Sequence, residues 1–296
     1  MSLGDINLIL AVGGLLAGLL VGLTGMGGAV IVTPMLVLLF GVPPAAAISS
    51  DLVAAAAMKP VGAWVHLRSG TVHWKLVGWI SAGSIPGVLI GTWLFSAVHA
   101  TPDAEATLRT LIGAVVLLAL VAMLAKNVVA SRAARTRQIV HIQQGVDMPI
   151  RAVPTIITGA VVGLIVGLTS VGSGSLVITA LLLMYPLLRP SVLVGTDLAQ
   201  AVPMLVVGAV AHSGFGEVFL PVVLSLLIGQ IPGVWLGARI SARYDGSALR
   251  WLLMVVLAAT AAKLLGAPSL VAAAIGVAGM AAVGVLALRN RRFEQA

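Results

Sequence analysis

The sequence has no cysteine, and charged residues make up only 9% of its 296 residues. The absence of cysteine excludes disulfide bonds, thiolate metal ligands and cysteine nucleophiles. The scarcity of charge excludes an ordinary soluble protein, because about a quarter of the residues of a soluble domain are charged. The first residues, MSLGDIN, lack the basic residues of a secretory signal peptide, so we expect the first apolar segment to stay in the protein.

Hydrophobic residues make up 60% of the chain, and they gather in long runs separated by short polar stretches. Several runs approach the roughly 20 residues that a helix needs to cross a bilayer. The sequence therefore predicts an all-α polytopic membrane protein. We place its apolar segments at residues 6–22, 28–41, 45–66, 74–97, 107–128, 152–168, 174–188, 191–212, 217–240, 248–265 and 268–288.

The net charge of +8 comes from basic residues in the loops between these segments, which argues against a nucleic-acid partner. If the N-terminus lies outside, 14 of the 17 basic residues lie inside, as the positive-inside rule requires. We therefore expect an outer N-terminus and a cytoplasmic C-terminus. The 14 residues are Arg68, Lys75, Lys126, Arg132, Arg135, Arg137, Arg151, Arg189, Arg239, Arg243, Arg250, Arg289, Arg291 and Arg292.

The two halves of the chain repeat one another at a nearly constant offset. Gly14 matches Gly159 at an offset of 145 residues, and Asp51 matches Asp197 at an offset of 146 residues. Each unit holds five apolar segments, and an odd number makes the second unit start from the opposite side of the membrane, as in many secondary transporters. We predict four regions: a first repeat at 1–128, a basic cytoplasmic linker at 129–151, a second repeat at 152–265, and an appended helix and tail at 266–296. The alternative for the linker is a regulatory or partner-binding role.

Two glycine-rich stretches occupy matched positions: the first glycine segment, residues 22–28, and the second glycine segment, residues 167–174. The apolar runs 6–22 and 28–41 span only about 25 Å and about 21 Å as helices, which is too short to cross a bilayer core comfortably. We therefore predict re-entrant or broken helices, whose free N–H groups suit an anion. The alternative is that these glycines only allow close helix contacts. The predicted substrate-binding residues are Thr24, Gly25, Gly27, Gly28, Lys59, Thr169, Ser170, Gly172, Ser173 and Gly174, with Ser175 as a further hydroxyl donor.

Three charged residues fall well within apolar segments, namely Asp51, Lys59 and Asp197. Charges at such depth are costly, and a functional role is the default hypothesis. The carboxylates are interpreted either as a proton- or cation-coupling pair or as helix caps, and Lys59 as a substrate or ion-pair residue or as a side chain that reaches the interface. Ser50, Thr196 and Gln200 join the predicted coupling set, whereas His66 and His212 are assigned an interfacial role, with a proton relay as the alternative.

Two further sets of glycines have helix-packing spacing, and no motif of an enzyme or a cofactor site is found. We expect no catalytic residues, no metal and no cofactor. The ridges, assigned to the scaffold or to a hinge, are Gly83, Gly87 and Gly91, and Gly229, Gly233 and Gly237.

The doubled pattern resembles the sulfite exporter TauE/SafE family over roughly residues 10–243. It consists of GMGGAVIVTP, FGVPPAAAISSDL, HLRSGTVHW and IPGVLIG in the first half, and VGSGSLVITALLL, LRPSVLVGTDL, AHSGFGEV and IPGVWLG in the second. The chain departs from the family pattern at Ala180, where the first half has Pro34, and at Asp51 and Asp197, where the family often has serine.

The resemblance implies a bacterial inner-membrane transporter of sulfur-containing anions such as sulfite or organosulfonates, without enzymatic activity. We predict a secondary transporter that works by alternating access, with a small anion and membrane lipid as its partners and a homodimer compatible with its glycine-ridged surfaces. The alternatives are an anion channel and a membrane scaffold or assembly protein.

Overall fold

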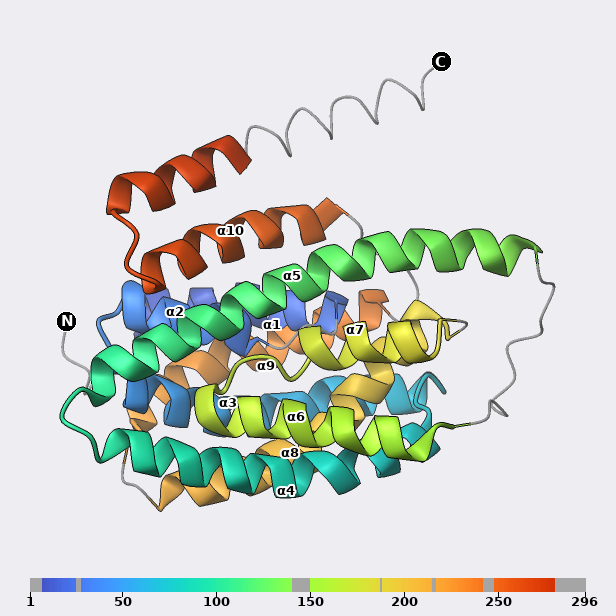
Figure 1. The fold of residues 1–296 in the computed structure, drawn as a ribbon, viewed down its shortest axis with the longest axis horizontal. Coiled ribbons are helices and arrows are strands. Elements are labelled where there is room, and N and C mark those ends of the chain that lie inside the picture. The colour runs from blue at the N-terminus through green and yellow to red at the C-terminus, as the bar shows by residue number, and fades with distance from the viewer. Residues whose placement is uncertain are drawn as a thin grey trace.

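The computed structural model describes residues 7–24, 28–139, 150–186, 188–214, 217–241 and 248–279. Within these ranges every regular element is a helix (Figure 1). The helices are α1 Leu8–Thr24, α2 Ala29–Leu38, α3 Pro44–Arg68, α4 Trp74–His99, α5 Ala104–Ile139, α6 Ala152–Thr169, α7 Ser175–Met184, α8 Pro190–Ser213, α9 Leu220–Ser241 and α10 Ala248–Leu264, followed by a further helix at Ser269–Gly279.

Five of these helices are long and apolar enough to cross a membrane, and large hydrophobic side chains are exposed on the outer surface of the bundle. Leu16, Trp93 and Val210 are more than half exposed, and a water-soluble surface would not carry many such side chains. The all-helical, polytopic membrane fold that the sequence predicts is confirmed.

The predicted segment boundaries agree with the helices to within a few residues, except at the end of the first half. There α5 continues to Ile139, so the first part of the predicted linker is helical. Its sequence, VASRAARTR, is rich in alanine and arginine, which favour helix wherever no glycine or proline interrupts them. The rest of the linker, residues 140–149, and the end of the predicted last helix lie outside the described residues.

Glycine ridges join α1 to α9 and α4 to α6, and these pairs pack most extensively. A Cβ atom built on Gly87 of α4 would overlap the carbonyl oxygen of Ala160 on α6, and one on Gly233 of α9 would overlap that of Leu15 on α1. The backbones therefore approach as closely as glycine permits. The helix-packing contacts expected of these ridges are confirmed.

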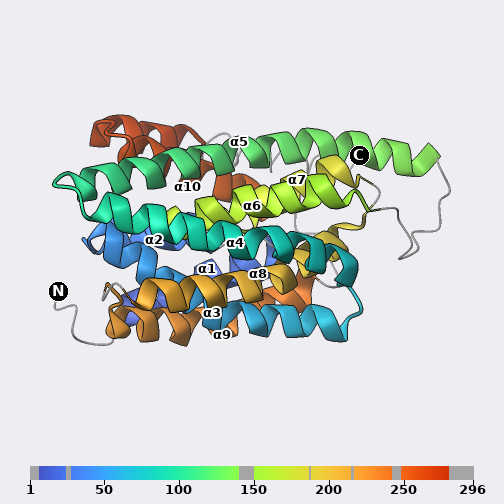
Figure 2. The ribbon, with the colours of Figure 1, turned by 60° about the horizontal axis from the view of Figure 1, so that its bottom comes forward.

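The helix contacts follow the alignment of the two halves. α1 packs on α9, and α6, which aligns with α1, packs on α4, which aligns with α9. α3 and α8 align with each other and pack together. Figure 1 shows α6 alongside α4, and Figure 2 shows α5 and α10 on the face opposite α3 and α9. The pairs α1–α9, α4–α6 and α3–α8 thus join the two halves of the chain.

Candidate functional site

Both glycine segments interrupt the helices, as the sequence predicts. α1 ends at Thr24 and α2 begins at Ala29, while α6 ends at Thr169 and α7 begins at Ser175. In the second segment Ser170 and Gly172 have positive φ angles of 62° and 109°, which no helix tolerates. The chain then turns back, so that α7 runs opposite to α6 (Figure 1). Gly25 and Gly27 of the first segment lie outside the described residues.

The start of α7 presents unused hydrogen-bonding groups inside the protein. Its N-cap, Gly174, supplies no side-chain hydrogen bond, and the Ser175 hydroxyl has no hydrogen-bond partner although that residue is only 2% exposed. The first N–H groups of a helix have no partner within it and carry partial positive charge. Buried polar groups are normally satisfied, so this end of α7 is suited to a ligand that accepts hydrogen bonds.

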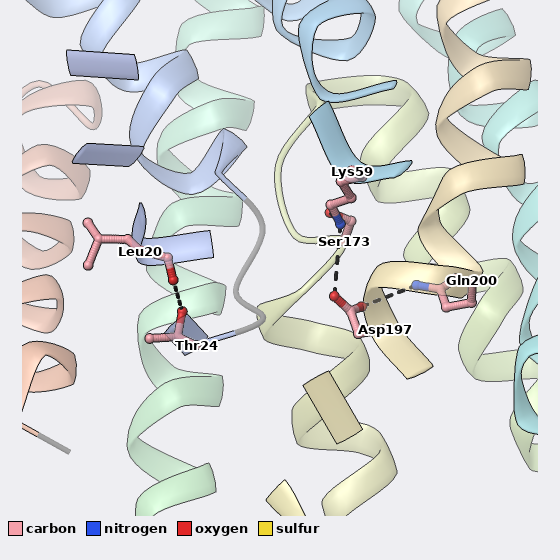
Figure 3. A network of polar contacts seen from close by, with 6 residues as sticks. All are labelled: Leu20, Thr24, Lys59, Ser173, Asp197 and Gln200. Carbon is pink, nitrogen blue, oxygen red and sulfur yellow. Dashed lines mark hydrogen bonds and ion pairs between the residues drawn. The ribbon is translucent and has the colours of Figure 1, made fainter. Parts of the chain in front are cut away.

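Lys59 of α3 reaches this point from the other half of the protein (Figure 3). Its Nζ donates a hydrogen bond to Ser173 Oγ at 2.9 Å and lies 3.9 Å from Asp197 Oδ2. Gln200 Nε2 donates to Asp197 Oδ1 at 3.2 Å. Because Lys59 is only 1% exposed, it does not reach the interface; it lies in a buried ion pair beside the second glycine segment.

Asp51, the repeat mate of Asp197, touches the same segment. Its Oδ2 accepts hydrogen bonds from Thr33 Oγ1 at 2.8 Å and from Ser170 Oγ at 2.9 Å. Its Oδ1 has no hydrogen-bond partner, and the residue is 1% exposed. One buried polar cluster therefore unites α2, α3, α8 and the second glycine segment; its members are Thr33, Asp51, Lys59, Ser170, Ser173, Asp197 and Gln200.

Other predicted site residues serve the scaffold in this conformation. Thr24 Oγ1 donates to the Leu20 carbonyl at 2.5 Å, as Figure 3 shows, and Thr169 Oγ1 donates to the Ile165 carbonyl at 2.8 Å. These hydroxyls bond the last turns of their own helices, and Thr169 Oγ1 also accepts a hydrogen bond from Val171 N at 3.3 Å. Gly28 is a packing position, because a Cβ atom there would lie 2.9 Å from a methyl of Val21.

Ser50 and Thr196 make equivalent contacts in the two halves. Ser50 Oγ accepts a hydrogen bond from the backbone N–H of Phe219 at 3.0 Å, and Thr196 Oγ1 accepts one from that of His73 at 3.0 Å. Phe219 and His73 immediately precede α9 and α4. These hydroxyls thus anchor the helix starts of the opposite half.

The side chains of His66 and His212 are both fully buried within the protein. His212 Nε2 lies 2.8 Å from the Gly167 carbonyl oxygen, and its Nδ1 lies 3.1 Å from Ser49 Oγ. His66 Nε2 lies 3.4 Å from Ser241 Oγ. The partners come from α9 for His66 and from α6 and α3 for His212, and helix position in the sequence alone does not reveal them.

Thr33 is the cluster member that sequence reasoning missed as a site residue. It is the lone hydroxyl in an apolar segment, and its repeat mate Thr179 donates instead to the carbonyls of Ser175 and Ala122. A single hydroxyl in an apolar segment indicates that a polar partner lies nearby. The identity of that partner, Asp51 of the next helix, depends on the fold.

Comparison with known proteins decides the family. The family model for the sulfite exporter TauE/SafE matches residues 10–264 of the chain. The chain belongs to the sulfite exporter TauE/SafE family. The resemblance seen in the sequence motifs is thereby confirmed.

Curated relatives of this TauE/SafE protein come from Bacillus subtilis (strain 168), and each bears the description "Probable membrane transporter protein". YjnA is 33% identical over 255 residues, which cover 85% of this chain and 97% of YjnA. YdhB is 27% identical, and the match covers 76% of this chain and 86% of YdhB. YunE is 26% identical, and the match covers 79% of this chain and 86% of YunE. No solved structure gives a significant match. The function class that family and relatives indicate is a membrane transporter rather than an enzyme.

Proposed function

We propose that the protein is a secondary transporter that moves small sulfur-containing anions, such as sulfite or organosulfonates, across the bacterial inner membrane by alternating access. The observation that carries this proposal is the buried Lys59 ammonium group, hydrogen-bonded to Ser173 beside the uncapped start of α7. The family description and the relatives' names support transport in general, and the substrate class rests on this site and on the family's printed description.

The chemistry of the site matches an oxyanion. A sulfite or sulfonate group offers three oxygens, which accept hydrogen bonds from an ammonium group, a hydroxyl and backbone N–H groups. Lys59 supplies the ammonium group, Ser175 the hydroxyl, and the first turn of α7 the backbone N–H groups. Ser173 would give up its hydrogen bond from Lys59, so that the ammonium group turns to the anion.

Charge balance supports proton coupling. When all three groups are ionised, Lys59, Asp51 and Asp197 carry a net charge of −1 in a buried site, and an anion adds to it. A proton taken up with the anion cancels the charge that the anion adds, and it reduces the cost of burying like charges. We therefore include proton uptake in the proposed cycle.

The arrangement of helices supplies a physical route to alternating access. The aligned helices α3 and α8 meet at the centre and carry Asp51 and Asp197, and each packs against helices of the opposite half. Two such halves, inserted in opposite orientations, can exchange conformations around one site. In this proposal the N-terminus lies outside the cell and the C-terminus in the cytoplasm.

Counterflow in proteoliposomes tests the proposal. Purified protein is reconstituted into vesicles preloaded with methanesulfonate, and uptake of the radiolabelled anion is followed. A carrier predicts transient accumulation that saturates with external anion and that excess sulfite, thiosulfate or another sulfonate suppresses.

The two other function classes give different results in the same vesicles. A channel would equilibrate the label without accumulation and would pass a measurable current. A scaffold protein would give no flux in the presence of any of these anions, and would instead copurify with a stable partner.

A further inference from the structure

We infer that Asp51 is the carboxylate that carries the coupling proton, and that Asp197 stays ionised as the fixed counter-ion of Lys59. This inference rests on the proposed function, since it assigns separate roles to two carboxylates within the proposed anion site. The two residues are repeat mates, and equal roles would be the simplest expectation from the sequence.

Asp197 is held in an environment that suits its ionised form. Its Oδ2 lies 3.9 Å from Lys59 Nζ, and its Oδ1 accepts a hydrogen bond from Gln200 Nε2. A proton on Asp197 would leave the buried ammonium group of Lys59 without its nearest anion, which is costly in a fully buried site. The Asp197 carboxylate therefore keeps its charge while Lys59 keeps its own.

Asp51 is surrounded by neutral hydroxyls and makes no ion pair in the described part of the chain. Both of its hydrogen bonds go to Oδ2, whereas Oδ1 has no partner. A proton on Oδ1 therefore leaves the bonds from Thr33 and Ser170 in place. The carboxyl group accepts a proton without displacing another cation, and it releases that proton without leaving a hydroxyl unpaired.

The helices that pack against α3 supply few other ionisable groups near Asp51. In the described residues, α2 has none, Arg239 of α9 is exposed, and Glu105 and Arg109 of α5 are exposed. Besides Asp51, the buried ionisable groups among the described side chains of α3 and of the helices packed on it are Lys59 and His66 on α3, and Asp197 and His212 on α8; His73, just before α4, and Tyr185, just after α7, are buried as well.

The contact with Ser170 links the proton to the anion site. Ser170 ends α6 in the left-handed conformation, and it is the one non-glycine residue with positive φ in the described chain. An ionised carboxylate accepts a stronger hydrogen bond than a neutral carboxyl group does. Protonation of Asp51 on Oδ1 therefore weakens the hydrogen bond from Ser170 without breaking it, and the second glycine segment, with Ser173 and the start of α7, changes conformation more readily as the anion binds.

Methanesulfonate transport with and without a proton gradient tests this assignment. This anion stays ionised across the working pH range, so any pH effect belongs to the protein. In the wild type, an inwardly directed proton gradient should stimulate uptake. In Asp51→Asn, which imitates the protonated carboxyl group, counterflow should persist at a lower rate and the stimulation should be lost. Asp197→Asn should transport poorly because its Lys59 is unpaired, but its remaining uptake should still respond to the gradient.

The outcomes separate this inference from the proposed function. Absence of counterflow in the wild type contradicts transport itself. If the wild type transports, three results overturn the assignment. One is an Asp51→Asn variant whose uptake still responds to the proton gradient. Another is a response that is lost only in Asp197→Asn. The third is the loss of counterflow in an Asp51→Asn variant that elutes as folded protein. Should Asp51→Asn not fold, Ser170→Ala provides the test: without this donor to the ionised form, half-maximal stimulation should move to higher pH, and an unchanged pH profile refutes the role of Asp51.

Discussion

At the scale of single residues, the two halves share a scaffold but differ in their polar cluster. Ser50 and Thr196 make equivalent contacts, whereas Lys59 aligns with Leu205, and Thr33 binds Asp51 while Thr179 does not bind Asp197. The described polar groups thus converge on the second glycine segment. A single anion site at that segment explains why only one lysine is buried there.

Substitutions at Lys59 should distinguish its contribution to stability from its role in transport. Lys59→Met leaves the Asp197 carboxylate buried without a cation, and we expect it to lower the free energy of unfolding by about 3–5 kcal/mol. The double variant Lys59→Met with Asp197→Asn removes both charges and should unfold near the wild-type temperature in a detergent melt, but it should not transport methanesulfonate. A double variant as unstable as the single one would show that the ion pair is not the cause.

His212 should stabilise the end of α6. His212→Phe removes the partner of the Gly167 carbonyl and of Ser49, and leaving a buried polar group unpaired costs about 1–3 kcal/mol. His212→Gln keeps an N–H donor and serves as the matched control, with a smaller loss expected. Thermal unfolding of the purified protein measures both, and an unchanged melting temperature in His212→Phe would mean that the side chain is not buried as described.

Sequence reasoning located the charged members of the cluster and the ion-pair role of Lys59, but not the contacts of these residues with the second glycine segment. Asp51, Lys59 and Asp197 stand out because charge is rare in apolar segments. The contacts of Lys59 with Ser173 and of Asp51 with Ser170 join residues more than a hundred positions apart, and they depend on how the two halves interlock.

At the scale of helices, glycine determines both where the helices end and where they touch. The breaks after Thr24 and Thr169 and the helix spans are predictable, because glycine runs and apolar lengths are local properties. The helix that each glycine ridge packs against is not predictable in this way. Close approach requires small residues on both helices, but these residues do not specify which two helices meet. The helical extension of α5 was missed because its charged residues indicated a loop.

Adding one methyl group to a ridge should test the packing directly. Gly87→Ala and Gly233→Ala place a Cβ atom against the carbonyl oxygen of the facing helix, and overpacking of this kind costs about 1–3 kcal/mol or more. Gly78→Ala on α4 is the control, because a Cβ atom there meets nothing within 4 Å and alanine favours the helix by about 0.5–1 kcal/mol. Equal melting temperatures for Gly87→Ala and Gly78→Ala would contradict the α4–α6 contact.

At the scale of the whole molecule, the asymmetry of basic residues predicts how the chain lies in the membrane. The turn between α3 and α4 follows Arg68, and the turn between α4 and α5 has no basic residue until Arg109. The positive-inside rule therefore places the first turn in the cytoplasm and the second outside.

The absence of cysteine makes this orientation easy to measure. Ser69→Cys and Thr101→Cys each introduce one thiol at an exposed position in these two turns. In intact cells, a membrane-impermeant maleimide should label Thr101→Cys at once and Ser69→Cys only after the cells are opened. The opposite pattern would invert the predicted topology.

The central claim is that one small anion binds at the start of α7 beside Lys59. Titration calorimetry of the detergent-solubilised protein with methanesulfonate, sulfite and thiosulfate tests it most directly. We predict saturable binding of one anion per chain for at least one member of this series, and its loss in Lys59→Met with Asp197→Asn, the variant that should remain folded. Binding of equal affinity in that double variant would place the anion elsewhere and contradict the account.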